Sequence, residues 1–101
     1  MDAGLKEKWL VALRSGEYKQ AVGTLKLASR NGYCCLGVLA EVAGLKPNEN
    51  VIEGVLTVGV AYNRIRDVAA LPSVSTDRLI RMNDIEQVPF SEIADWVEAN
   101  L

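Results

Sequence analysis

The only thiols of the chain are Cys34 and Cys35, which stand side by side at the start of the apolar stretch CCLGVLAEVAGL. Neither can form a Cys-His catalytic pair, because the sequence contains no histidine. The same absence excludes Ser-His-Asp triads and zinc sites that need imidazole. Two cysteines are too few for a four-ligand zinc site, and a disulfide between neighbours closes a strained ring. We therefore expect Cys34 and Cys35 to be core residues, because Cys often packs as a small hydrophobe.

Other catalytic patterns are missing from the sequence as well. No pair of carboxylates and no nucleophile beside a base stands out by its spacing, and no glycine-rich phosphate loop is present. These observations favour a protein that is not an enzyme. We expect no catalytic residue, no bound metal and no cofactor.

Residues that could bind a ligand are easier to find. The segment Glu17-Tyr18-Lys19-Gln20 joins an aromatic ring, a cation and an amide just after a predicted helix. Loops in such positions often carry binding residues. Tyr18, Lys19 and Gln20 are therefore candidate ligand-binding residues, and Tyr18 could stack on a base. The alternative interpretation is an ordinary solvated connection.

Arginines of the C-terminal half are a second group of candidates. They could together hold a phosphate or a carboxylate, because the guanidinium group suits bidentate acceptors. The four are Arg64, Arg66, Arg78 and Arg81. The alternative is that they lie on solvated helix faces. Asn83 is a further candidate, but its place on an apolar helix face favours a buried amide bonded to neighbouring backbone.

Charge and hydropathy limit the partners. The net charge of −2 and the pI of about 5.1 give no general attraction to nucleic acid or to acidic membrane surfaces. Two predicted helices at 75–85 and 90–101 could form a helix-turn-helix, but the exposed face of the second is acidic and would repel phosphates. The N-terminus does not resemble a signal peptide, and no apolar run reaches about 18 residues. We expect a cytoplasmic protein that binds neither membrane nor specific nucleic acid.

The N-terminal half is predicted to form a helix and then a strand. Apolar residues recur on one face over residues 3–15, as in an amphipathic helix. Side chains alternate over residues 22–28, which predicts a strand before the turn signal Asn31-Gly32. The partner of this strand is either Tyr33-Cys34 or the β-branched segment 51–58, and the sequence does not decide between them.

Residues 35–43 are predicted to form the central helix. Apolar side chains go all round this segment, which is typical of a helix buried on every side. Gly44 is placed to cap its C-terminus. Gly37 lowers the helix propensity by about 1 kcal/mol relative to Ala, so we expect another segment to approach the backbone closely there.

Three more helices are expected in the C-terminal half. Residues 61–71 form one that Pro72 stops, and the next begins with Ser75 or Thr76 as its N-cap. The last covers residues 89–101 and has the clearest apolar face. The fold class is therefore α+β, in which residues 1–101 form one mainly helical domain with a small β-sheet packed against the buried helix 35–43.

Motifs spread over nearly the whole chain resemble those of a known family. They are KWLVALRSGEYKQAVGTL, GYCCLGVLAEVAGL and LIRMNDIEQVPFSEIADWVEANL. The chain is similar in these motifs to a family of small proteins encoded by tailed bacteriophages and prophages. It departs from the family where Ala21-Val22-Gly23 replaces a frequent Gly-Arg-Gly and Leu39-Ala40-Glu41 replaces a frequent Leu-Cys-Asp.

The resemblance implies a setting inside an infected bacterium. Small phage accessory proteins commonly block or sequester host components, which suggests an anti-defence binder that sequesters a host signalling nucleotide in a pocket or at a dimer interface. Tyr18, Lys19, Gln20 and the arginines would form its polar rim. Two alternatives remain open: an inhibitor that binds a host defence protein such as a nuclease complex, and a structural or regulatory phage protein.

Overall fold

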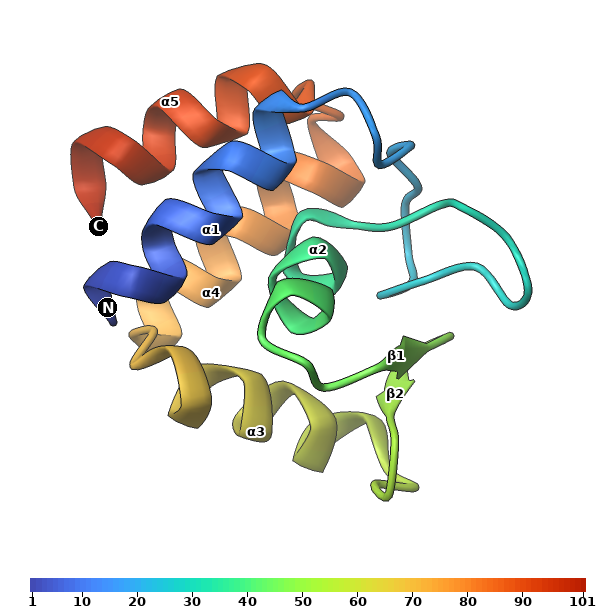
Figure 1. The fold of residues 1–101 in the computed structure, drawn as a ribbon. Helices are drawn as coiled ribbons and strands as arrows, with labels where there is room; N and C mark the ends of the chain where they lie inside the picture. Colours follow the sequence, from blue (N-terminus) through green and yellow to red (C-terminus); the bar gives the residue numbers. More distant parts are fainter.

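The computed structural model describes all residues from Met1 to Leu101 and places one short apolar helix at the centre of the fold (Figure 1). This helix, α2, spans Cys35–Val42, and six of its eight residues are buried. Gly44 adopts a left-handed conformation just after it, at φ +77°. The Leu45 N–H then donates to the Ala40 carbonyl at 2.9 Å, which closes the last turn. The predicted helix and its glycine cap are both confirmed.

Four further helices and one π-helical turn complete the helical part of the fold. They are α1 (Ala3–Arg14), α3 (Val58–Ala69), α4 (Ser73–Ile80), the π-helical segment η1 (Arg81–Ile85) and α5 (Phe90–Asn100). The indole N–H of Trp9 on α1 donates to the carbonyl of Cys35 at 2.9 Å, so the only polar atom of this fully buried side chain is satisfied. The apolar face predicted for the last helix is buried, as Phe90, Ile93 and Val97 all lie in the core.

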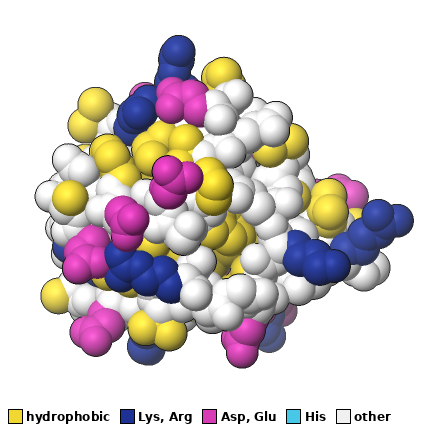
Figure 2. All heavy atoms as spheres, turned by 90° about the horizontal axis from the view of Figure 1, so that it is seen from above, with side chains coloured by type: hydrophobic (Ala, Val, Ile, Leu, Met, Phe, Trp, Pro, Cys, Tyr) yellow, Lys and Arg dark blue, Asp and Glu magenta, His cyan; other side chains and the backbone are white.

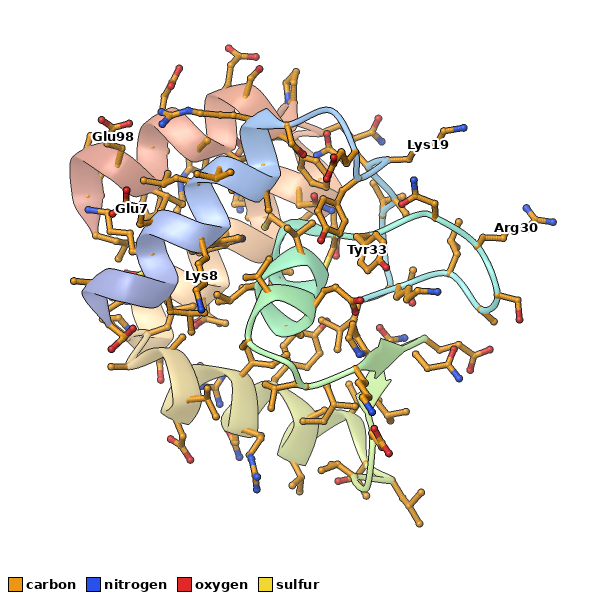
Figure 3. All side chains as sticks on the ribbon, in the orientation of Figure 1. Glu7, Lys8, Lys19, Arg30, Tyr33 and Glu98 are labelled. Carbon is orange, nitrogen blue, oxygen red and sulfur yellow. The ribbon has the colours of Figure 1, made fainter.

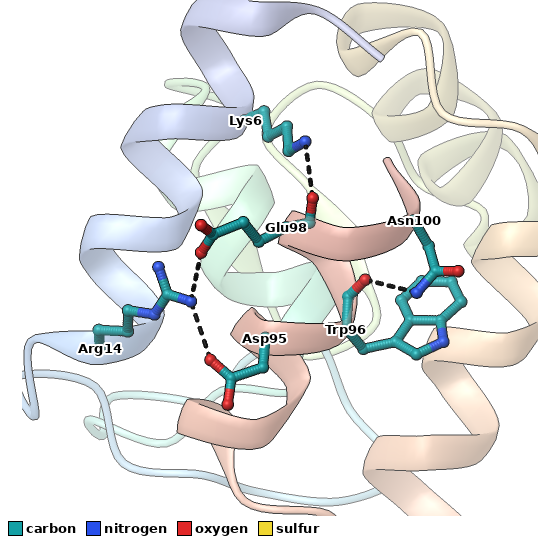
Figure 4. A network of polar contacts seen from close by, with 6 residues as sticks. All are labelled: Lys6, Arg14, Asp95, Trp96, Glu98 and Asn100. Carbon is teal, nitrogen blue, oxygen red and sulfur yellow. Dashed lines mark hydrogen bonds and ion pairs between the residues drawn. The ribbon is translucent and has the colours of Figure 1, made fainter.

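The exposed edges of α1 and α5 are joined by polar contacts (Figure 4). The guanidinium group of Arg14 lies 2.9 Å from a carboxylate oxygen of Asp95 and 2.6 Å from one of Glu98. The hydrogen bond to Glu98, and to a smaller extent the one to Asp95, raises the pKa of Arg14. The ammonium group of Lys6 donates to the main-chain carbonyl of Glu98 at 3.3 Å. The two ends of the chain are thereby held side by side.

The β-sheet is smaller than the sequence indicates. Its two strands, β1 (Pro47–Asn48) and β2 (Val51–Ile52), pair antiparallel, and β1 lies beside α2 (Figure 1). The prediction of a strand over 51–58 is wrong beyond Ile52, because Gly54 turns the chain at φ +81° and Val58 already begins α3. The fold is nevertheless α+β and mainly helical, as expected.

Residues 22–28 do not form the predicted strand. Only Lys26 makes isolated bridges there, to Tyr33 and to Glu49. The chain turns at Gly23, where φ is +75°, and again at Ser29, where φ is +55°. The side chains of residues 22–28 alternate as in a strand, but Gly23 is left-handed inside the segment and Ser29 is left-handed just after it, and the chain between them forms no continuous ladder.

The boundary between α3 and α4 also differs from the prediction. Ala70 takes a left-handed conformation at φ 52° and ends α3 before Pro72 is reached. The next helix begins at Ser73, so neither Ser75 nor Thr76 is its N-cap. Thr76 is instead buried, and its hydroxyl donates to the carbonyl of Pro72 at 3.0 Å. None of the helices is long and apolar enough to cross a membrane.

Candidate functional site

The segment between α1 and α2 is a long loop that projects from one edge of the molecule (Figure 1). Residues 18–33 contain three cations and no carboxylate, whereas the rest of the chain has eight cations and thirteen carboxylates. On the right of Figure 2, Lys and Arg side chains stand out from the edge that this loop forms. The loop is therefore the electropositive part of an otherwise acidic protein.

A groove of about 430 Å³ is hollowed into this loop. It is lined by Lys19, Gln20, Leu27, Arg30, Asn31 and Gly32. Figure 3 shows Lys19 and Arg30 extending from the same edge of the molecule. Neither of the two forms an ion pair with a carboxylate, whereas Arg14, Lys46, Arg78 and Arg81 all do. Two cations and the second amide hydrogen of Asn31 are thus available to an anion in this groove.

The third cation of the loop has a structural role. The ammonium group of Lys26 donates to the carbonyls of Leu27 and Arg30, at 3.2 and 3.0 Å. It also lies 5.6 Å from the centre of the Tyr33 ring, within the range of a cation–π interaction. The amide of Asn31 holds the other side of the turn by donating to the carbonyl of Glu17 at 2.9 Å. Lys26 therefore shapes the turn that carries Arg30.

A buried amide fastens the loop to the core. Asn83, on η1, is fully buried, and its side-chain oxygen accepts hydrogen bonds from Gln20 Nε2 at 3.0 Å and from the Cys35 N–H at 3.2 Å. Its Nδ2 donates to the carbonyl of Ala21 at 2.8 Å. Gln20 also donates to the Val88 carbonyl at 2.7 Å. Asn83 is thus a buried amide bonded to neighbouring backbone, as its place on an apolar helix face predicts. It also holds Gln20 at the rim of the groove.

Tyr18 and Lys19 are neighbours in sequence but line different hollows. Tyr18 packs edge-on against Tyr33, with ring centroids 5.1 Å apart. Burial raises the pKa of both phenols. Tyr18 borders a separate depression along α1, which Val11 and Val42 also line. The expected rim of Tyr18, Lys19 and Gln20 is therefore divided between two surfaces.

The four arginines do not form one cluster. Arg78 and Arg81 converge on the carboxylate of Glu86, at 2.8 and 3.2 Å. Arg64 and Arg66 lie on α3, across the molecule from Lys19 (Figures 1 and 3), and Arg66 donates to Asn63 on the same helix. No hydrogen bond or ion pair joins these arginines to the loop. Of the predicted binding residues, only Lys19, Gln20 and Asn83 come together at the loop.

The cysteines are core residues, as expected. Cys34 caps α2 by accepting a hydrogen bond from the Gly37 N–H at 3.3 Å, and Cys35 is fully buried. Burial raises the pKa of Cys34 to about 11 and that of Cys35 well above its ordinary value. Both thiols are therefore protonated at neutral pH and poor nucleophiles. The chain also has no group of three or more acidic or Cys side chains placed to hold a metal ion.

Arg30 and Asn31 are the groove residues that the sequence interpretation missed. The sequence pattern assigns Asn31 only to a turn and does not place Arg30 among the candidate residues. The available signal was the run of sixteen residues, 18–33, without a single carboxylate. Such a run in an acidic chain marks a local positive potential, although the net charge conceals it.

Comparison with known proteins identifies the chain only at the level of its family. No curated protein and no solved structure matches it. Residues 1–76 match the family described as a domain of unknown function, DUF8296. The match includes α1, the electropositive loop of residues 18–33 (the cationic loop), α2, the sheet and α3. The groove therefore lies within the matched region. The chain belongs to the DUF8296 family.

Proposed function

We propose that this chain is a small accessory protein of a tailed bacteriophage or prophage that acts in the host cytoplasm by sequestering a phosphate-bearing signalling nucleotide of host defence. The observation that carries the proposal is the groove of the cationic loop, in which Lys19 and Arg30 have no carboxylate partner. The phage setting rests on the sequence motifs described above, and the binding mode rests on the groove.

The groove has the chemistry to hold a phosphate. The planar guanidinium group of Arg30 can donate two parallel hydrogen bonds to phosphate oxygens, and the Lys19 ammonium adds a point charge. Asn31 can donate its second amide hydrogen to a remaining oxygen, whereas Gln20 already donates both of its amide hydrogens to Asn83 and Val88. The exposed side chain of Leu27 offers an apolar surface for a sugar or base. Because Tyr18 faces the other depression, we infer that the phosphates, rather than a stacked base, give most of the affinity.

The same residues favour binding without turnover. No carboxylate, thiol or imidazole lines the groove, so it contains no general base that could activate water. The two cysteines lie in the core with a raised pKa and cannot act as nucleophiles on a ligand in the loop. A sequestering protein needs only affinity and sufficient abundance.

An inhibitor that binds a host defence protein is the second candidate. The observation that favours it is the exposed apolar side chains around the start of α3, where Leu56 is 93% exposed and Val60 is 54% exposed. Exposed apolar residues that cluster on one surface are typical of protein interfaces.

Native mass spectrometry can separate these candidates. The purified protein is mixed with a panel of cyclic dinucleotides and ADP-ribose-derived nucleotides, and bound mass is recorded for the wild type and for Lys19→Ala and Arg30→Ala. We expect a retained nucleotide that both substitutions remove, whereas the matched control Arg64→Ala on α3 keeps it. Absence of any bound nucleotide at concentrations well above micromolar would overturn the proposal and leave the protein-binding candidate.

A further inference from the structure

The outward face of α1 has a ridge between two hollows. One hollow, of about 630 Å³, lies on the side facing α2. The other, of about 370 Å³, lies on the side facing α5. Glu7 and Val11 border both hollows, and they are one helical turn apart. Val11 is 64% exposed although it is a large apolar residue in the middle of a helix. No element of the chain covers this ridge.

The larger hollow is suited to another helix. Along α1 it is lined by the small residues Gly4, Ala12 and Ser15, and α2 contributes Val42. A Cβ atom built on Gly4 would meet only Asp2, at 3.7 Å, so the surface above Gly4 is open. Small residues let a second helix approach closely, and a ridge of side chains four residues apart packs into such a groove.

We propose that this face of α1 binds a second copy of the same chain, so that the protein forms a two-fold symmetric dimer. The Glu7–Val11 ridge of each copy lies in the larger hollow of the other. A two-fold interface must be self-complementary, and this face meets that condition because one helix carries both the ridge and the groove.

Charge supports a second copy as the partner. Glu7 stands on the ridge. The larger hollow is lined by one cation, Lys8, which Figure 3 shows on the edge of α1 nearer α2, and also by Glu17, which follows the C-terminal end of α1. Neither Glu7 nor Lys8 forms an ion pair within the chain. In the dimer, Glu7 of each copy approaches Lys8 of the other, which forms two equivalent opposite-charge pairs. Such pairs fix the register of an interface more than they strengthen it.

The dimer face is separate from the cationic groove. Neither Lys19 nor Arg30 borders the hollows along α1, and none of the ridge residues lines the groove. Nucleotide binding and self-association can therefore fail independently. The inference does not depend on the proposed function.

Charge reversal combined with sedimentation equilibrium tests the dimer. We expect the wild type to dimerise and both Glu7→Lys and Lys8→Glu to weaken association at least about tenfold, because each creates like-charge pairs across the two-fold axis. The double variant Glu7→Lys/Lys8→Glu restores opposite charges and should recover association. Glu92→Lys, an exposed reversal on α5, is the matched control and should leave the dimer unchanged.

The result is clear in each direction. All three reversed positions are exposed, so far-UV circular dichroism should show the same helix content in every variant. A wild type that stays monomeric at the highest soluble concentration overturns the inference. It is also overturned by a dimer that ignores the single reversals, or by a double variant that associates no better than the single ones.

Discussion

Gly37→Ala should destabilise the protein, because the added Cβ atom forces the Leu25 backbone away from the central helix. A Cβ atom at Gly37 would lie 1.7 Å from the carbonyl oxygen of Leu25 and 2.6 Å from its carbon. The backbone of Leu25 would have to retreat by roughly 1.5 Å or more to reach ordinary contact. That movement breaks the hydrogen bond from the Cys34 N–H to the Leu25 carbonyl, which costs about 1 kcal/mol. Overpacking costs about 1–3 kcal/mol more, and the better helix propensity of Ala returns about 1 kcal/mol.

The expected net loss is about 1–3 kcal/mol in the free energy of unfolding. Urea denaturation followed by tryptophan fluorescence, to which the fully buried Trp9 and the half-buried Trp96 both contribute, measures it. The matched control is Gly59→Ala near the start of α3, where nothing lies within 4 Å of the added Cβ atom. This variant should be as stable as the wild type or up to about 1 kcal/mol more stable. Equal stability of the two variants would refute the close approach of the loop to α2.

Three further substitutions or conditions test the loop anchor, the core thiols and the end of α3. Asn83→Ala removes the buried amide and should lower the free energy of unfolding by about 2–3 kcal/mol, whereas Asn63→Ala on the exposed face of α3 should change it by less than about 0.5 kcal/mol. Because burial raises the pKa of Cys34 to about 11, the native thiol stays protonated where the unfolded one ionises. The contribution of this thiol to the free energy of unfolding is fully present below about pH 8.5 and decreases by up to about 3 kcal/mol towards pH 11. Thiol reagents should label the protein only after it unfolds. Ala70→Gly removes the strain of a left-handed alanine at the C-cap of α3 and should raise the melting temperature. Ala69→Gly, inside the helix, should lower it, and equal shifts of the two variants would contradict the left-handed conformation of Ala70.

The elements that the sequence predicts correctly are those with a dense apolar pattern. Residues 35–43 are apolar on all sides, which left a buried helix as the only reasonable interpretation. The amphipathic last helix was equally clear. Gly37 gave a third correct prediction, because a glycine inside a helix needs a reason and the carbonyl of Leu25 is that reason.

The errors arise where the backbone, rather than side-chain periodicity, decides the structure. Residues 22–28 alternate like a strand, but left-handed turns at Gly23 and Ser29 break it. Ala70 and Ser29 are not residues that signal a left-handed conformation, so no sequence pattern could place those turns. The β-branched residues of 51–58 indicated a strand, and Val58 nevertheless opens a helix.

The candidate site was predicted in part. Lys19 and Gln20 were identified as loop residues, and both line the groove. Arg30 was missed because it follows Lys19 by eleven residues, and only the folded turn brings the two to the same groove. The arginines of α3, α4 and η1 look equivalent in sequence. Arg78 and Arg81 nevertheless pair with Glu86, which directly follows η1, whereas the α3 arginines lie elsewhere. Whether a cation is paired with a carboxylate depends on its neighbours in the folded structure, and a single sequence does not reveal them.

The central claim is that the loop groove holds phosphate, and amide chemical shifts test it most directly. We would titrate uniformly ¹⁵N-labelled protein with ADP-ribose and, in parallel, with inorganic pyrophosphate. The account predicts saturable shifts concentrated at residues 19–32 for both probes, and their loss in Arg30→Ala but not in Arg64→Ala. Absence of shifts at millimolar probe, or shifts confined to α1 and α3, would contradict it.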